Sequence, residues 1–283
     1  MIKNKKKIIV SSHSGFCFGV KRALDIAENA LKRKSIVYSF GPIIHNPQVV
    51  REFEEKGLKI IKNIKRLKKN ASLLIPSHGM NPKLLGKKGV SYIDTTCPLV
   101  NRVQKIVRNL TNKNYDIIII GDKKHPEVKG LVGIAGSSSR VIKNKKEARK
   151  LKLKRGRVAL ISQTTASISN FKEILSEITK KDFSEFVSFN TVCKNTIDRQ
   201  KEARRIAERV GTMLIIGGKQ SANTSRLAKH CKAVNRRTYH IESERDLRKA
   251  LVKNESKIGI ATGASTPPYA TKKVMERIRR LEN

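Results

Sequence analysis

The sequence contains no tryptophan and only 23 acidic residues, against 62 lysines and arginines. It also lacks any apolar run near the roughly 20 residues that a membrane-spanning helix needs, so we expect no membrane span. The first residues, MIKNKKKIIVSSHSGF, hold only three consecutive apolar residues. A signal peptide needs a core of about 7–15, so we expect a cytosolic protein.

Close cysteine pairs are absent as well. Structural zinc sites usually use four ligands and often CxxC pairs, whereas the four cysteines here stand alone. In a cytosolic chain, such cysteines are more typical of metal ligands or reduced thiols than of disulfides. Cys231, in LAKHCKAV on a predicted helix, lacks a polar turn like those that accompany the other cysteines and is interpreted as a buried or incidental thiol.

The net charge of +39 is extreme, but the lysines are spread over nearly the whole chain. The sequence has no RNP-like aromatic motif, no CxxC…HxxxH finger and no aromatics interleaved with the basic runs. We therefore expect no specific nucleic-acid binding. The charge is compatible with solvated basic faces and with an acidic protein partner.

The 283 residues alternate between strand-like and helix-like segments. This alternation predicts an α/β fold with mostly parallel sheets, because helices form the crossovers. The length suits one large domain or two to three small ones.

A module that begins at a cysteine occurs three times. After each cysteine come a helix-like run, an apolar strand and a polar residue, which lies 28 positions after the cysteine. The three pairs are Cys17 and His45, Cys97 and His125, and Cys193 and Ser221. Self-similarity on this scale indicates a pseudo-symmetric architecture.

A second set of strands extends each module. The runs SLLIPSHG, VALISQTT and IGIATGAST end in His78, Thr164 and Ser265. We place the three α/β units at residues 1–97, 98–190 and 191–268, and we assign 269–283 to a C-terminal helix that packs back on the body. If the units meet at an axis, three thiolates and about six polar groups converge there.

Three lone thiolates from three units suit an iron–sulfur cluster. Four cysteines normally close such a cluster, so three leave one iron open to a substrate. The open iron can then act as a Lewis acid as well as an electron source.

The polar residues after the strands fit an anionic substrate. Imidazoles, hydroxyls and backbone N–H groups at such positions are the set that binds phosphate. The candidates are His45, His78, His125, Thr164, Ser221, Asn223 and Ser265. Glu127 is a carboxylate in a site otherwise made of donors, which favours a role as proton source.

These motifs resemble the LytB family of 4-hydroxy-3-methylbut-2-enyl diphosphate reductases. The resemblance runs from about residue 8 to 280 and rests on GFCFGVKRAL, HNPQVV, SHG, DTTCPLV, HPEV, SQTT, DRQ, SANTSRL and GAS-P. It implies three α/β domains in a trefoil around a central 4Fe–4S cluster. It also implies an oxidoreductase of isoprene biosynthesis, which removes the allylic hydroxyl to give isopentenyl and dimethylallyl diphosphate.

The resemblance assigns a role to each candidate residue. It implies cluster ligation by Cys17, Cys97 and Cys193, and proton delivery by Glu127, with Thr164 orienting the substrate hydroxyl. It places His45, His78, His125, Ser221, Asn223 and Ser265 around the diphosphate.

The basic charge adds an expected partner, an acidic electron donor such as a flavodoxin or a ferredoxin. Two other functions use the same residues. A structural zinc protein that binds RNA would use the cysteines and the charge, and a redox or iron sensor would hold the cluster without turnover. The predicted set of hydrogen-bond donors is large enough for a diphosphate, which favours the enzyme over both alternatives.

Overall fold

The computed structural model describes residues 6–33, 36–153, 156–253 and 255–282. The chain divides into two compact units. The terminal unit comprises residues 1–20, 45–51 and 194–283, and the central unit comprises residues 21–44 and 52–193. The described strands form three sheets of four parallel strands each, so the predicted α/β fold with parallel sheets is confirmed.

The terminal unit holds one sheet in the order β1-β12-β10-β11. Its strands are β1 (Lys7–Val10), β10 (Thr212–Ile216), β11 (Thr238–Ile241) and β12 (Lys257–Thr262). Its helices are α7 (Lys194–Ala207), α8 (Ala222–Lys232), α9 (Lys249–Val252) and α10 (Pro268–Glu282), with a 3₁₀ turn at Glu244–Asp246.

The central unit holds two sheets, β3-β2-β4-β5 and β7-β6-β8-β9. The strands of the first are β2 (Val37–Phe40), β3 (Leu58–Ile61), β4 (Ser72–Ile75) and β5 (Ser91–Asp94). Those of the second are β6 (Asp116–Ile120), β7 (Ser139–Ile142), β8 (Arg157–Ser162) and β9 (Glu185–Ser188). The helices are α3 (Pro98–Asn112), α4 (Pro126–Ala135), α5 (Lys145–Lys150) and α6 (Ile168–Ile178), with 3₁₀ turns at Ile64–Arg66, Pro82–Leu84 and Gly136–Ser138. The division between the units falls within α1 (Phe18–Arg33) and α2 (Pro47–Glu55).

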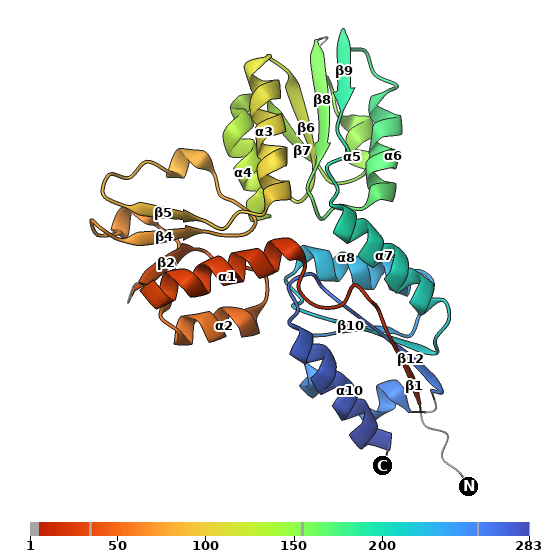
Figure 1. Ribbon diagram of the computed structural model, residues 1–283. Coiled ribbons are helices and arrows are strands. Elements are labelled where there is room, and N and C mark those ends of the chain that lie inside the picture. Colours follow the sequence, from red (N-terminus) through yellow and green to blue (C-terminus); the bar gives the residue numbers. More distant parts are fainter. Residues whose placement is uncertain (1–5, 34–35, 154–155, 254, 283) are drawn as a thin grey trace. The chain divides into compact units, whose positions relative to one another are not determined.

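Helices cover both faces of two of these sheets (Figure 1). Along β10, Met213 and Ile215 pack toward α7 and α8, while Leu214 and Ile216 pack toward α10. The four isoleucines of β6 alternate in the same way, toward α3 and α4 on one face and toward α5 and α6 on the other. Burial on both faces explains why these strands are apolar throughout.

The first strand lies outside the unit that the sequence predicted for it. Residues 1–97 were expected to form one unit, but β1 pairs with β12, with Lys7 opposite Lys257 and Val10 opposite Ile260. The apolar side chains of β1, Ile8 and Val10, pack with the core under α10, which covers this same sheet. Otherwise each sheet draws its strands from one predicted segment, and the division into three domains stays a prediction.

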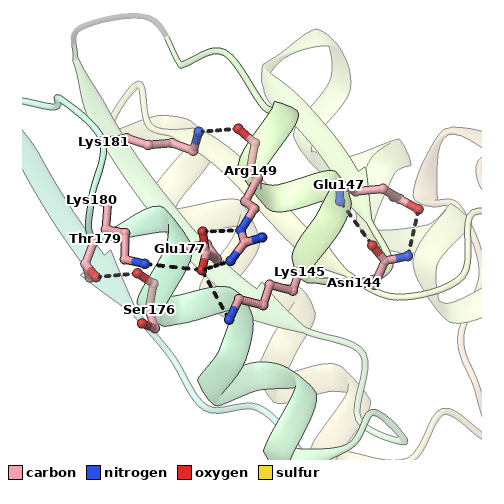
Figure 2. A network of polar contacts seen from close by, with 9 residues as sticks. All are labelled: Asn144, Lys145, Glu147, Arg149, Ser176, Glu177, Thr179, Lys180 and Lys181. Atoms are coloured by element: carbon pink, nitrogen blue, oxygen red, sulfur yellow. Dashed lines mark hydrogen bonds and ion pairs between the residues drawn. The ribbon is translucent and has the colours of Figure 1, made fainter.

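An ion-pair network joins α5 to α6 (Figure 2). The buried carboxylate of Glu177 on α6 accepts hydrogen bonds from Arg149, at 2.9 Å from Nε and 3.4 Å from Nη2. Lys145 and Lys180 lie 3.4 and 3.3 Å from the same carboxylate. The hydrogen bond from Arg149 is the main cause that lowers the pKa of Glu177 to about 2. The carboxylate of Glu177 therefore stays charged, and its ion pairs persist, at pH values well below neutral.

Candidate functional site

The predicted site residues lie in the turns that follow parallel strands. In the terminal unit, β1, β10 and β12 lead into the turns that carry Cys17, Ser221 and Ser265. In the central unit, β4 leads to His78, β6 to His125 and β8 to Thr164. Because the carboxyl ends of parallel strands share one edge of a sheet, each sheet gathers its polar turns at a single edge.

One backbone hydrogen bond ties each cysteine turn to the second polar turn of another module. The N–H of Cys17 donates to the carbonyl of Ala264, next to Ser265, at 3.0 Å. The N–H of Cys97 donates to Ser77, next to His78, at 2.9 Å, and that of Cys193 donates to Thr164 at 2.8 Å. The sequence repeat therefore corresponds to a repeated hydrogen bond between the backbone of a cysteine and a polar turn.

The cysteines of these turns differ from the fourth cysteine. Cys17, Cys97 and Cys193 are half-buried and directly precede a helix, and no disulfide joins any of the four in the described structure. Cys231 is fully buried among Leu227, Met213 and Ile215, and burial raises the pKa of its thiol to about 12. The prediction that Cys231 is a buried thiol is confirmed.

The terminal unit brings His45 to the turns of Ser265 and Ser221. The Ser265 hydroxyl donates to the His45 carbonyl at 3.1 Å, and a Cβ added at Gly218 would lie 3.2 Å from that same oxygen. Gly218 lies in the turn that leads to Ser221, whose hydroxyl caps α8 by accepting the N–H of Thr224 at 3.3 Å. Burial lowers the pKa of His45, so its ring is neutral at pH 7.

Asn223 adds an amide donor to this cluster. It is 7% exposed, and its Nδ2 has no hydrogen-bond partner among the residues that the structure describes. A buried amide without a partner is costly, which suits a group that completes its hydrogen bonds with a ligand.

The central unit pairs Glu127 with Thr164. Glu127 lies on the first turn of α4 and is 2% exposed. Its carboxylate accepts the backbone N–H of Thr164 at 2.7 Å and the hydroxyl of Thr164 at 2.8 Å. Two hydrogen bonds from one residue fix the position of this buried carboxylate.

His125 precedes Glu127 and caps the same helix. Its Nδ1 accepts the N–H of Glu127 at 3.2 Å, so the neutral ring carries its proton on Nε2. The ring of His78 lies 6.3 Å away between centroids, edge-on at 71°. The central unit thus brings together the carboxylate of Glu127, the hydroxyl of Thr164 and two of the predicted imidazoles.

A groove of about 850 Å³ opens beside His78 in the central unit. We name it the basic groove, because Lys62, Lys83, Lys123 and Lys129 line it and no carboxylate does among the described residues. Leu84, which is 43% exposed, adds an apolar surface. The sequence alone does not reveal this groove, because its lysines are far apart in the chain and only the fold brings them together.

The sequence analysis also missed Arg199 and Glu202 on α7. Arg199 lies in the DRQ motif after Cys193, and its side chain is almost fully buried, at 2% exposed. For Arg199, the helical pattern of α7 held a signal of burial. Thr196, Arg199 and Gln200 occupy the same buried face as Ala203 and Ala207, where apolar residues are normal.

The predicted metal ligands are divided between the two units. Among residues 6–33, 36–153, 156–253 and 255–282, no group of three or more histidine, cysteine or carboxylate side chains forms a metal site. Cys17 belongs to the terminal unit, and Cys97 and Cys193 belong to the central unit. No helix within these ranges is long and apolar enough to cross a membrane.

Comparison with known proteins identifies the family. The sequence matches the family model described as LytB protein over residues 8–279. A relative from Caldanaerobacter subterraneus subsp. tengcongensis is 42% identical over 283 residues, and one from Geobacter metallireducens is 38% identical over 280 residues, each match covering 98% of both chains. Both are named 4-hydroxy-3-methylbut-2-enyl diphosphate reductase.

Two solved structures agree with this result. A 4-hydroxy-3-methyl-but-2-enyl diphosphate reductase described as the terminal enzyme of the non-mevalonate pathway matches with a TM-score of 0.68 and 38% identity, over 98% of this chain and 100% of that one. The corresponding reductase from Plasmodium falciparum matches with a TM-score of 0.89 and 28% identity, over 99% and 89%. These relatives are oxidoreductases, which confirms the predicted enzyme class. The chain therefore belongs to the LytB protein family, as its motifs predicted.

Proposed function

We propose that this protein reduces (E)-4-hydroxy-3-methylbut-2-enyl diphosphate to isopentenyl and dimethylallyl diphosphate, the last step of the non-mevalonate isoprenoid pathway. Two electrons and two protons enter, the allylic C–O bond breaks and water leaves. The observation that carries the proposal is the backbone hydrogen bond that ties each of the three half-buried cysteines to a polar turn. The names of the relatives give the substrate.

The donor set fits one 4Fe–4S cluster held by Cys17, Cys97 and Cys193, with one iron left open. Each of these thiols directly precedes a helix, and a helix N-terminus favours the thiolate that binds iron. Cys231 stays a protonated thiol in the core and takes no part. When bound, the cluster supplies electrons and a Lewis-acidic iron for the substrate hydroxyl.

The remaining donors of both units are proposed to bind the diphosphate. Asn223 offers its Nδ2, His125 offers Nε2–H, and the N-terminus of α8 offers backbone N–H groups beside Ser221. His45, His78 and Ser265 complete this set. Imidazole N–H groups and side-chain amides donate hydrogen bonds to phosphate oxygens.

Glu127 is proposed to deliver the proton that turns the departing hydroxyl into water. A general acid must lie within hydrogen-bond reach of its acceptor. The Thr164 hydroxyl, 2.8 Å from Glu127, orients the substrate hydroxyl toward that carboxyl and holds the carboxyl in place. His125, on the same helix turn, acts beside it.

The electrons are proposed to come from an acidic protein such as a flavodoxin or a ferredoxin, which docks on the basic groove. The four lysines complement an acidic surface, and Leu84 provides the apolar contact that a transient redox complex needs. His78 lines both this groove and the proposed substrate site, which gives electrons a short route.

We also propose that the protein works in the cytosol and binds neither a membrane nor a specific nucleic acid. Four cysteines without a disulfide are typical of a reducing compartment.

The test is turnover by anaerobically purified protein with a reduced viologen dye as electron donor. Formation of both diphosphates supports the proposal. A protein that holds zinc after reconstitution with iron and sulfide contradicts it and favours a binding module. A protein that holds the cluster without turnover favours a sensor.

A further inference from the structure

Two charged residues of α7 contact the loop that leads to Cys17. The loop comprises residues 11–16, between β1 and α1, and we name it the Cys17 loop. Arg199 and Glu202 lie one helical turn apart on α7, which begins at the residue after Cys193. Both reach the Cys17 loop within the terminal unit.

Arg199 joins the Cys17 loop to the end of β12. Its Nη2 donates to the Gly15 carbonyl at 3.1 Å, and its Nη1 donates to the carbonyl and hydroxyl of Thr262 at 2.9 and 3.2 Å. The Thr262 hydroxyl in turn accepts the N–H of Gly15 at 2.8 Å. Two residues beyond Thr262, the Ala264 carbonyl accepts the N–H of Cys17. Arg199 therefore fixes two backbone segments around Cys17: the Cys17 loop and the end of β12.

Glu202 holds the beginning of the same loop. Its carboxylate accepts four hydrogen bonds, from the Ser11 hydroxyl at 2.5 Å, the Ser12 N–H at 3.0 Å, the Ser12 hydroxyl at 2.9 Å and the His13 N–H at 3.2 Å. Burial alone would raise the pKa of Glu202, but these hydrogen bonds outweigh it and lower the pKa to about 2. The carboxylate is therefore charged at any pH near neutral.

This arrangement differs from ordinary helix packing. The core contacts of α7 are made by Ala203 and Ala207, which pack with the strands of the sheet. The hydrogen bonds of Glu202 end on consecutive residues of the Cys17 loop instead. Gly15 has φ +93°, a conformation that residues other than glycine rarely adopt, so this turn of the loop requires a glycine.

We propose that Arg199 and Glu202 are positioning residues that hold the Cys17 thiolate in the geometry needed to bind iron. The proposal rests on the proposed function, since it takes Cys17 as a cluster ligand. Without either side chain, the Cys17 loop opens more often and the cluster loses one ligand.

The test uses the conservative variants Glu202→Gln and Arg199→Lys, which keep the size of each side chain. The matched controls are Glu208→Gln and Arg204→Lys, an exposed ion pair of 3.1 Å in the same helical region. Two quantities are measured on reconstituted protein: hydrogen exchange of the amides at residues 11–17, and the rate at which a chelator removes iron. Losing a hydrogen bond to a charged group predicts an increase of about tenfold in both for the test variants. The controls should match the wild type.

Faster exchange of the Cys17 loop with unchanged iron loss would mean that the two residues serve only the stability of the fold, and the proposal would be wrong. Unchanged exchange would also overturn it. A wild-type protein that takes up no cluster overturns the proposed function, and this proposal with it. The equivalent hydrogen bonds of the other two cysteines serve as internal references: exchange of the Cys97 and Cys193 amides, which donate to the carbonyls of Ser77 and Thr164, should stay constant in both test variants.

Discussion

Replacing Glu127 by glutamine should abolish most turnover while leaving the fold and the cluster intact. Glutamine has the same shape, so its oxygen still accepts the N–H of Thr164, a bond of 2.7 Å, and its amide can donate to the Thr164 hydroxyl. Only the transferable proton is lost. General acid catalysis contributes about 10²–10⁴-fold, so the barrier should rise by about 2.7–5.4 kcal/mol.

The assay is steady-state turnover under anaerobic conditions, with iron content measured on the same samples. We expect kcat to fall by about 10²–10⁴-fold while KM changes little, because the diphosphate contacts remain. Thr164→Val is the companion variant. It keeps the proton but removes the hydroxyl that holds the carboxyl, which should cost about 1.5–3 kcal/mol. A Glu127→Gln enzyme within about twofold of wild type would remove Glu127 from the proton path.

Serine in place of Cys17, Cys97 or Cys193 should lower the bound iron and the visible absorbance, whereas Cys231→Ser should keep both; iron loss in the latter would show that the ligand set is wrong. Reversing three charges of the basic groove (Lys62→Glu, Lys83→Glu and Lys129→Glu) should slow turnover with an acidic flavodoxin but not with a viologen dye. Reversal of the exposed Lys105, Lys152 and Lys172 is the matched control, and equal effects of both triples would contradict docking at the groove. Because the pKa of Glu177 is lowered from 4.5 to about 2, its stabilising effect should be complete above pH 4.5 and vanish toward pH 2. Urea unfolding of wild type and Glu177→Gln should therefore converge as the pH falls, and a constant difference would contradict the assignment.

The sequence predicted those features that depend on local pattern. Uniformly apolar runs such as IIII at Ile117–Ile120 indicated strands buried on both faces, and helix-like runs between them indicated parallel sheets. The polar residues that follow the strands could also be identified from the sequence. Glu127 and Thr164 were therefore both predicted as site residues, although the sequence did not show that they contact each other. The hydrogen bond that repeats at the three cysteines runs to the second polar turn, beside Ser265, His78 and Thr164, and the constant offset did not reveal this partner.

Other features depend on contacts between distant segments. The short strand Lys7–Val10 carries no local signal that it pairs with β12 instead of with the strands that follow it. Arg199 and Glu202 look like ordinary charges of a solvated helix until the Cys17 loop folds over them. The basic groove likewise exists only because the fold places Lys62 and Lys129 on the same hollow.

The central claim is that three thiolates hold a cluster whose open iron faces the substrate. The most direct measurement is the visible absorption spectrum of anaerobically reconstituted protein, recorded with and without the hydroxymethylbutenyl diphosphate. We expect a brown protein with about four irons per chain and a spectrum that changes when the substrate is added. A protein that stays colourless and holds zinc, or a brown protein whose spectrum does not change with the substrate, would contradict the proposed cluster site.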